Sequence, residues 1–195
     1  VGEVIQVWKP RELNTHETEW GFSCMSYEIS GALGIKMANP DKEVISFVGD
    51  GSYLLNNTDI YSSVITNNKL IIIVCDNGGF AVINRLQLFK GGNEYNNLLK
   101  SSNTPGLVDV DFAKHAESMG AKSEHVNSIS DLEEAFKRAK KSDVTYVISI
   151  KTHAYQWLEG SAFWDSPTLE IPTTKENKEA LKLYKEGKNK QRQGV

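Results

Sequence analysis

The hydrophobic positions of this chain gather into short, nearly continuous runs. Residues 44–48, 70–75 and 144–150 are almost all apolar, and polar or glycine residues follow each run at once. Runs of this length with turn residues at their ends are typical of strands that are buried on both faces of a sheet. One further short strand is expected around 121–126.

Helical spacing of the apolar residues predicts helices between these strands. The expected helices span 23–38, 55–66, 112–119 and 131–141. Asp111 and Ser130 are expected to cap the last two, with Glu133 at the capping-box position after Ser130. Strands and helices therefore alternate, which predicts an α/β fold: an open, mostly parallel sheet with helices on both faces.

Two segments do not follow this alternation. Residues 76–105 are rich in Gly and Asn, and because a loop of this length is usually functional, we expect a lid that tightens when a ligand binds. Residues 151–195 combine aromatic side chains with a basic, helix-like end. We expect one α/β domain over 1–150 and a C-terminal extension over 151–195 that packs on it.

The carboxyl ends of two predicted strands carry a candidate site. Asp50 follows the first strand on a glycine-flanked turn, and Asn77 follows the second strand one helix later. Ligands of open α/β sheets bind at this edge, and one carboxylate with one amide oxygen suits Mg²⁺. The alternative is that Asp50 only caps a helix and that Asn77 begins an ordinary turn.

This pattern resembles the cofactor fingerprint of thiamine diphosphate (ThDP) enzymes. In that fingerprint a Gly-Asp-Gly turn precedes an asparagine by one helix and one strand, as Asp50 precedes Asn77. The resemblance implies that ThDP is the cofactor and that Mg²⁺ clamps its diphosphate. The metal ligands would be the side chains of Asp50 and Asn77 and the backbone carbonyl of Gly79.

The resemblance also assigns contacts to the cofactor itself. Gly49, Gly51 and Ser52 would surround the diphosphate, through backbone N–H groups and the Ser52 hydroxyl, as the starts of helices do. The carbonyl of Ser23 would accept a hydrogen bond from the cofactor's amino group. Met25 would wedge between the two rings of the cofactor, since an unbranched thioether fills irregular gaps; the alternative is a plain core position.

The catalytic acid is expected outside this chain. In ThDP enzymes a glutamate from a separate pyrimidine-binding domain, of the same or a partner subunit, activates the cofactor, and no segment of this sequence resembles that domain. His16 precedes the cofactor helix in a loop and is a candidate proton shuttle. We therefore expect the chain to be the cofactor-binding part of a longer, homo-oligomeric enzyme and to be inactive alone.

Longer segments narrow the resemblance to one family of ThDP enzymes. Those that carry it are 14–16, 19–28, 48–54, 76–80 and 83–87. Together they resemble the C-terminal domain of trihydroxycyclohexanedione hydrolases over nearly the whole chain. Two features depart from the pattern: Asp76 stands where many ThDP enzymes have Asn, and residues 91–97 are unlike the family's loop.

The narrower resemblance implies hydrolysis of a C–C bond that opens a cyclic 1,2-diketone to 5-deoxy-glucuronate in bacterial myo-inositol catabolism. The thiazolium ring would add to a carbonyl and act as an electron sink. Two alternatives remain open. One is a carboligase similar to acetolactate synthase, and the other is a non-catalytic module that binds a diphosphate or serves assembly.

Composition limits the other classes of function. The 195 residues carry a net charge of −3, which favours neither nucleic acid nor an anionic membrane surface. No apolar run reaches the roughly 20 residues of a membrane span. Two cysteines provide no disulfide framework, so we expect the reducing cytoplasm. The sequence contains neither Gly-x-Ser-x-Gly nor Gly-x-Gly-x-x-Gly, which leaves serine hydrolases and dinucleotide binding without support.

Overall fold

The computed structural model describes residues 4–19, 21–103, 106, 108–158 and 168–191. The chain forms two compact units. Unit 1 comprises Val1–Gly79 and Val108–His153, and unit 2 comprises Phe80–Leu107 and Ala154–Val195.

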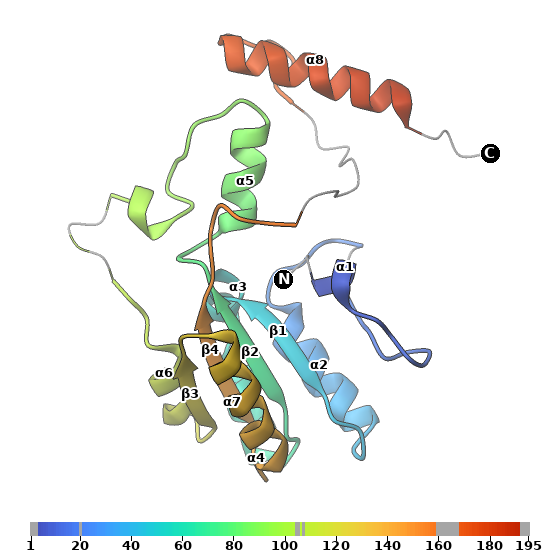
Figure 1. The fold of residues 1–195 in the computed structure, drawn as a ribbon, viewed down its shortest axis with the longest axis vertical. Helices are drawn as coiled ribbons and strands as arrows, with labels where there is room; N and C mark the ends of the chain where they lie inside the picture. The colour runs from blue at the N-terminus through green and yellow to red at the C-terminus, as the bar shows by residue number, and fades with distance from the viewer. Residues whose placement is uncertain (1–3, 20, 104–105, 107, 159–167, 192–195) are drawn as a thin grey trace. The chain divides into compact units, whose positions relative to one another are not determined.

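Within the described residues, unit 1 is built on a four-stranded parallel sheet. Its strands are β1 (Ile45–Gly49), β2 (Ile71–Asp76), β3 (Lys122–Val126) and β4 (Tyr146–Lys151), in the order β1-β2-β4-β3 (Figure 1). Gly49 pairs with Cys75 and Asp76 pairs with Lys151, so the strands end together at one edge. This arrangement confirms the predicted α/β fold.

Helices cover both faces of the sheet. Two hydrophobic cores lie on opposite faces of the sheet. The helices that contribute to the first are α2 (Tyr27–Ala38), α3 (Asp50–Leu55), α4 (Thr58–Ile65) and α6 (Phe112–Ser118), and α7 (Ile129–Lys141) contributes to the second. Successive residues of β2 alternate between them: Ile72 and Val74 join the first core, and Ile71 and Ile73 join the second. Burial on both sides explains why this strand reads as a continuous apolar run.

Several predicted helix boundaries differ from the structure. The helix expected at 23–38 begins only at Tyr27, because Ser23 and Ser26 have left-handed φ angles of 52° and 78° that a right-handed helix cannot contain. α4 (Thr58–Ile65) lies within the helix expected at 55–66, but it is preceded by a separate helix, α3, which ends at Leu55 and is followed by the extended residue Asn56. A short helix α1 (Val4–Val7) also lies in the polar N-terminal segment.

The N-terminal cap of α7 is Ser128, so the prediction of Ser130 and of a capping box at Glu133 is wrong. Ser128 has an extended backbone, and its Oγ accepts a hydrogen bond from Asp131 N at 3.1 Å. Ser130 therefore lies inside the first turn of the helix. Asp111 caps α6 as predicted, since its side chain accepts a hydrogen bond from the backbone N–H of residue 114.

Unit 2 contains helices in both segments that the alternation left unassigned. α5 (Ala81–Phe89) and the 3-10 helix η1 (Leu99–Ser101) lie in the Gly- and Asn-rich segment, and α8 (Lys175–Lys190) lies near the C-terminus. Residues 76–105 are therefore not one continuous loop. α8 is fixed at its start, where Asn177 Nδ2 donates to the Gly91 carbonyl at 2.7 Å.

Two aromatic side chains of the C-terminal segment belong to unit 2. The Nζ atom of Lys100 lies 4.0 Å from the ring centroid of Tyr155, and the guanidinium carbon of Arg85 lies 4.2 Å from that of Trp157. The aromatic residues 163 and 164 lie outside the described part of the chain. None of the helices in the described ranges is long and apolar enough to cross a membrane.

Candidate functional site

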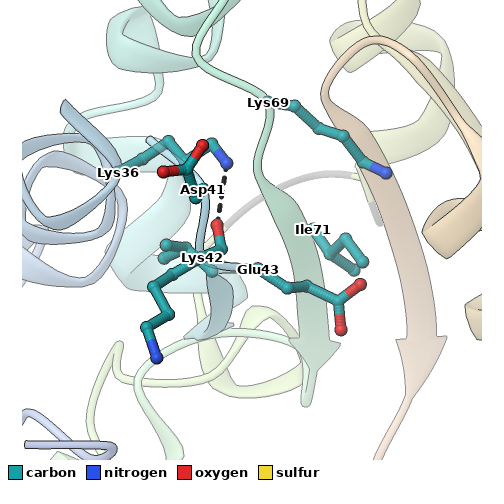
Figure 2. A pocket seen from close by; sticks show the side chains of 7 residues that line it. Lys36, Asp41, Lys42, Glu43, Lys69 and Ile71 are labelled. Atoms are coloured by element: carbon teal, nitrogen blue, oxygen red, sulfur yellow. Dashed lines mark hydrogen bonds between the residues drawn. The ribbon is translucent and has the colours of Figure 1, made fainter. Parts of the chain in front are cut away.

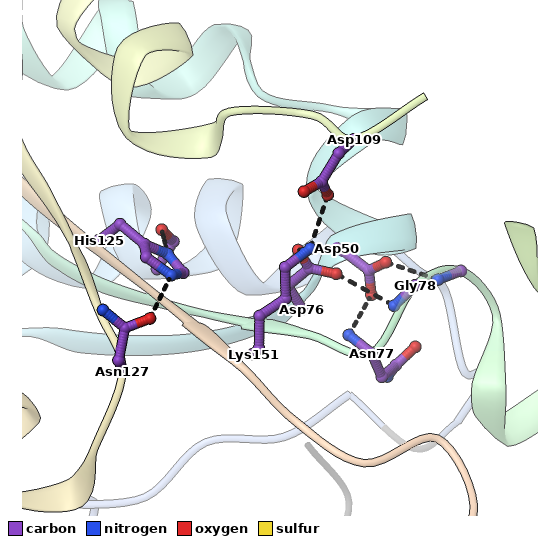
Figure 3. A network of polar contacts seen from close by, with 10 residues as sticks. Asp50, Asp76, Asn77, Gly78, Asp109, His125, Asn127 and Lys151 are labelled. Carbon is purple, nitrogen blue, oxygen red and sulfur yellow. Dashed lines mark hydrogen bonds and ion pairs between the residues drawn. The ribbon is translucent and has the colours of Figure 1, made fainter. Parts of the chain in front are cut away.

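The edge formed by the carboxyl ends of β1 and β2 carries the predicted metal ligands. Asp50 is the first residue of α3, directly after β1, and only 4% of it is exposed. Asn77 directly follows β2 (Figure 3). Because β1 and β2 are adjacent and parallel, the two residues lie at the same edge, as the sequence predicts.

The turn after β2 wraps its backbone around the Asp50 carboxylate. Oδ2 of Asp50 accepts a hydrogen bond from Gly79 N at 2.6 Å, and Oδ1 accepts one from Asn77 N at 3.3 Å. Gly78 and Gly79 have φ angles of 79° and 139°, which residues with a Cβ rarely adopt. Asp76 Oδ1 accepts a hydrogen bond from Gly78 N at 3.0 Å and thereby fixes the turn (Figure 3).

Asn77 points one terminal atom of its side-chain amide at two oxygens. This atom lies 3.2 Å from Asp50 Oδ1 and 2.8 Å from the carbonyl oxygen of Gly79. If this atom is the nitrogen of the NH₂ group, it donates to both oxygens. If it is the amide oxygen, three oxygens converge at this point. Octahedral Mg²⁺ ligands at about 2.0–2.1 Å stand about 2.9 Å apart. In the second orientation the two separations from the Asn77 oxygen, 3.2 and 2.8 Å, are therefore close to those of a Mg²⁺ site, and a bound cation would select it.

Among the described residues, no cationic side chain forms an ion pair with Asp50. Lys151, at the end of β4, forms ion pairs with Asp76 and Asp109, both at 2.6 Å (Figure 3). Burial raises the pKa of the Asp50 carboxyl, the hydrogen bond from the Asn77 backbone lowers it, and the nearby charge of Asp76 raises it again. A divalent cation at this place would favour the ionised carboxylate.

The donor set fits Mg²⁺ better than a soft transition metal. One carboxylate, one amide oxygen and one backbone carbonyl are hard oxygen ligands. In the described ranges, no three His, Cys, Asp or Glu side chains are grouped so as to hold a metal. Three protein oxygens leave the other octahedral positions of Mg²⁺ open for water or for the oxygens of a diphosphate.

Ser52 joins α3 to the turn before α2. Its Oγ accepts a hydrogen bond from Ser26 N at 2.6 Å and donates one to Glu28 Oε2 at 2.7 Å. The hydroxyl that was expected to contact the diphosphate is thus engaged within the protein. The backbone N–H groups of Gly51 and Ser52 lie in the first turn of α3, where they have no partner within the helix and can bind an anion.

The turn before α2 presents Ser23 and Met25. Glu19 braces this turn, since its two carboxylate oxygens accept hydrogen bonds from Phe22 N and Cys24 N, both at 2.7 Å. Met25 is 38% exposed, which argues against a plain core position. Ser23 has a left-handed φ of 52°, a conformation that is uncommon for residues other than glycine.

Described contacts do not bring His16 to this site. Its side chain is exposed, and its Nε2 lies 3.4 Å from Thr18 Oγ1. Sequence reasoning missed Lys151. Lys151 directly follows the apolar run at 144–150, so the rule that located Asp50 could also have found it.

A surface pocket of about 200 Å³ lies at the opposite edge of the sheet, where β1 and β2 begin (Figure 2). Lys36, which lines this pocket, already forms hydrogen bonds within the protein, because Nζ donates to the carbonyls of Pro40 and Lys42, both at 2.7 Å. The lining mixes lysines with carboxylates and offers no convergent set of donors. The residues that line it are Lys36, Asp41, Lys42, Glu43, Val44, Lys69 and Ile71.

Comparison with known proteins agrees with the geometry of the sheet edge. The family model described as thiamine pyrophosphate enzyme, C-terminal TPP binding domain, matches residues 2–150. The 3D-(3,5/4)-trihydroxycyclohexane-1,2-dione hydrolase of Shouchella clausii (strain KSM-K16) is 37% identical over 181 residues, which are 92% of this chain and 28% of the relative. The protein of the same name in Bacillus subtilis (strain 168) is 37% identical over 163 residues, 84% of this chain and 25% of the relative.

A solved structure is also similar. The Rhodococcus jostii RHA1 thiamine diphosphate-dependent 4-hydroxybenzoylformate decarboxylase superposes with a TM-score of 0.55 at 27% identity, over 66% of this chain and 23% of that chain. This chain therefore spans only about a quarter of the length of the relatives that it matches. The matched range includes Asp50 and Asn77, and the chain belongs to the thiamine pyrophosphate enzyme family, of which it contains the C-terminal TPP binding domain.

Proposed function

We propose that the full protein is a ThDP- and Mg²⁺-dependent hydrolase that opens 3D-(3,5/4)-trihydroxycyclohexane-1,2-dione to 5-deoxy-glucuronate in myo-inositol catabolism. One observation supports this most: one terminal atom of the Asn77 side-chain amide lies 3.2 Å from Asp50 Oδ1 and 2.8 Å from the Gly79 carbonyl oxygen, in a chain whose curated relatives carry the name of this hydrolase. The reaction adds one water molecule across the C–C bond between the two carbonyl carbons, which leaves one of them as a carboxylate.

In this proposal the residues at the sheet edge hold the diphosphate half of the cofactor. The side chains of Asp50 and Asn77 and the carbonyl of Gly79 would hold Mg²⁺, which would leave positions for oxygens of the diphosphate. The N–H groups of Gly51 and Ser52 bind the same diphosphate at the start of α3. Backbone hydrogen bonds from the turn after β2 hold the Asp50 carboxylate in place before the metal arrives.

The turn before α2 orients the rings of the cofactor. The carbonyl of Ser23 accepts a hydrogen bond from the amino group, and the exposed thioether of Met25 fills the space between the rings. Glu19 on one side and Ser52 on the other keep this turn in its strained shape. When bound, ThDP supplies a carbon nucleophile and an electron sink for the bond that is cleaved.

The remaining parts of the active site come from outside the chain in this proposal. A glutamate on a pyrimidine-binding domain, of the same or a partner subunit, activates the cofactor. The active form is a cytoplasmic homo-oligomer, and residues 1–195 alone do not turn over the dione. An assay of residues 1–195 with ThDP, Mg²⁺ and the dione tests this division, since turnover equal to that of the full-length protein would contradict it.

The main test compares Asp50→Asn with Asp59→Asn in the full-length protein. Asp50→Asn removes the only charged ligand, so we expect Mg²⁺-dependent ThDP binding to weaken by about 100-fold, whereas Asp59 lies on α4 and its change leaves binding intact. Calorimetry measures ThDP binding, and loss of the dione measures turnover. Unchanged binding in Asp50→Asn would refute the metal assignment.

The alternatives give different outcomes in the same assay. Consumption of pyruvate in place of the dione would indicate a carboligase similar to acetolactate synthase. Binding of ThDP with no turnover of either substrate would indicate a non-catalytic module.

A further inference from the structure

Unit 2 contains a cluster of polar side chains that the proposed function leaves unassigned. Asn84 on α5 and Tyr155 both bond to one oxygen of Glu94: Oε1 accepts a hydrogen bond from Asn84 Nδ2 at 3.0 Å and another from Tyr155 Oη. The Nζ atom of Lys100 lies 4.0 Å from the Tyr155 ring centroid. These four residues are called the Glu94 cluster below.

The Glu94 cluster has hydrogen-bonding capacity that the described part of the chain leaves unused. Asn84 is 1% exposed, and its Oδ1 is a buried acceptor without a hydrogen-bond partner among the described residues. Such atoms are rare in folded proteins and call for an explanation, of which a ligand donor is one. The described hydrogen bonds of Glu94 all fall on Oε1, so Oε2 can accept from a further donor.

The ionisation of Glu94 makes it an acceptor only. Hydrogen bonds from Tyr155 and Asn84 lower the pKa of the Glu94 carboxyl, so it is charged at neutral pH. An ionised carboxylate attracts hydroxyl donors and repels the carboxylate of a 2-oxo acid. The cluster therefore suits an uncharged compound with several hydroxyl groups better than it suits pyruvate.

A partly exposed aromatic ring lies close in the chain to Tyr155. Trp157 follows Tyr155 by two positions and is 44% exposed, and Arg85 follows Asn84 and stacks on the Trp157 ring. A partly exposed aromatic ring with a few fixed polar groups is typical of small-molecule sites, because the ring packs on the apolar face of the ligand.

We propose that the Glu94 cluster recognises hydroxyl groups of a cyclic polyhydroxylated ketone, which donate to Glu94 Oε2 and Asn84 Oδ1. Tyr155 and Lys100 are positioning residues that hold the carboxylate. The assignment to the dione rests on the proposed function, whereas the preference for a polyol rests on the cluster alone.

The kinetic test uses the full-length enzyme with Glu94→Gln and Tyr155→Phe. The matched controls are Glu186→Gln, which is exposed on α8, and Tyr95→Phe, which is 70% exposed in the same loop as Glu94. We expect Glu94→Gln to raise KM for the dione about tenfold or more and Tyr155→Phe to raise it less. The dissociation constant of ThDP stays unchanged in all four variants, and the controls keep the wild-type KM.

A second measurement does not depend on turnover. Saturation-transfer NMR on the full-length protein without ThDP uses myo-inositol as the probe and pyruvate as the comparison. We expect a signal for myo-inositol that Glu94→Gln and Tyr155→Phe weaken, and no signal for pyruvate.

The outcomes separate this inference from the proposed function. An unchanged KM in both variants, or an equal myo-inositol signal in wild type and both variants, would overturn the polyol site while the reaction stands. If the wild type binds ThDP but does not consume the dione, the proposed function fails and the NMR comparison alone decides the cluster. If Glu94→Gln does not fold, Tyr155→Phe decides.

Discussion

The two Gly-Gly pairs of this chain look alike in sequence but serve different purposes. In unit 1, positive φ angles at Gly78 and Gly79 let the backbone turn toward Asp50, and a Cβ on Gly78 would meet no atom within 4 Å. In unit 2, Gly91 also has a positive φ, but a Cβ there would stand 2.6 Å from the backbone of Glu176. The first pair is required for conformation, and the second leaves no space for a side chain.

This difference shows what each turn contributes. The backbone of the first turn presents N–H groups to a carboxylate and a carbonyl to the proposed metal, so its shape is tied to binding. The second turn lets α8 pack closely, and its carbonyl accepts the hydrogen bond from Asn177. Alanine substitutions should therefore affect binding in one case and stability in the other.

Gly91→Ala is expected to have the largest effect. Its Cβ would overlap backbone atoms of Glu176, which move only if α8 shifts as a whole, and the positive φ adds strain. We expect unit 2 to lose at least about 2 kcal/mol of stability, seen as faster hydrogen exchange of the amides in α8. Gly34→Ala is the control, because open space in α2 predicts a gain of about 0.5–1 kcal/mol. Unchanged exchange in α8 would contradict the close contact.

Gly79→Ala is expected to act on binding. Its φ of 139° strains any residue with a Cβ, and relief of the strain rotates the N–H that bonds Asp50 and the carbonyl proposed to bind Mg²⁺. We expect ThDP affinity in Mg²⁺ to fall about tenfold or more in the full-length protein. Gly120→Ala, with a φ of 84°, carries similar strain and should leave affinity unchanged. Equal losses in both variants would mean that the effect is general destabilisation.

Only some parts of the site could be predicted from the sequence. Asp50 and Asn77 were found because each follows an apolar run, and neighbouring parallel strands end at one edge whatever packs around them. The hydrogen bond from Ser52 to Glu28 joins two helices far apart in sequence, and no local pattern encodes it. The close contact at Gly91 likewise exists only once α8 has packed.

The fold itself was predictable where local pattern and burial agree. Strand β2 is buried on both faces, so its sequence is apolar throughout. Helix α5 escaped prediction because Gly and Asn dominate the composition around it, while its neighbours hold it through side chains. Asn84 Nδ2 donates to Glu94 at 3.0 Å, and Asn97 Nδ2 donates to Gln87 at 2.5 Å.

Ser52→Ala should have a smaller effect than either glycine change. Ser26 has a positive φ without being glycine, and its N–H is held by the Ser52 hydroxyl. Removing the hydroxyl leaves this N–H without its partner, so we expect a loss of about 1 kcal/mol in a denaturant melt and ThDP binding weaker by roughly threefold. Ser62→Ala on α4, where the hydroxyl donates weakly at 3.4 Å to a helix carbonyl, should change neither. If Ser52→Ala changes neither stability nor ThDP binding, Glu19 alone is sufficient to hold the turn.

The smallest effect separates the two turns by their response to pH. Both turns bond a carboxylate, but burial raises the pKa of Asp50 beside the first turn, whereas the loop that follows Gly91-Gly92 is held by Glu94, whose pKa is lowered. The hydrogen bond from Tyr155, and after it that from Asn84, lowers the pKa of Glu94 below its ordinary value of 4.5. A carboxylate with a lowered folded pKa contributes stability that is present above the unfolded pKa and is lost as the pH falls through the folded one.

Unit 2 should therefore lose part of its stability as the pH falls below about 4.5, and Tyr155→Phe should lose less, because the first cause of the lowered pKa is gone. Glu94 is partly exposed, so solvent screening keeps the difference small. The measurement is the melting temperature at neutral pH and at about pH 3.5. Tyr95→Phe should show the same change of melting temperature with pH as the wild type, since the other carboxylates contribute equally to both proteins. Equal slopes in Tyr155→Phe and the wild type would show that the phenol does not hold Glu94 in its ionised form, and the proposed acceptor for hydroxyl groups would lose its support.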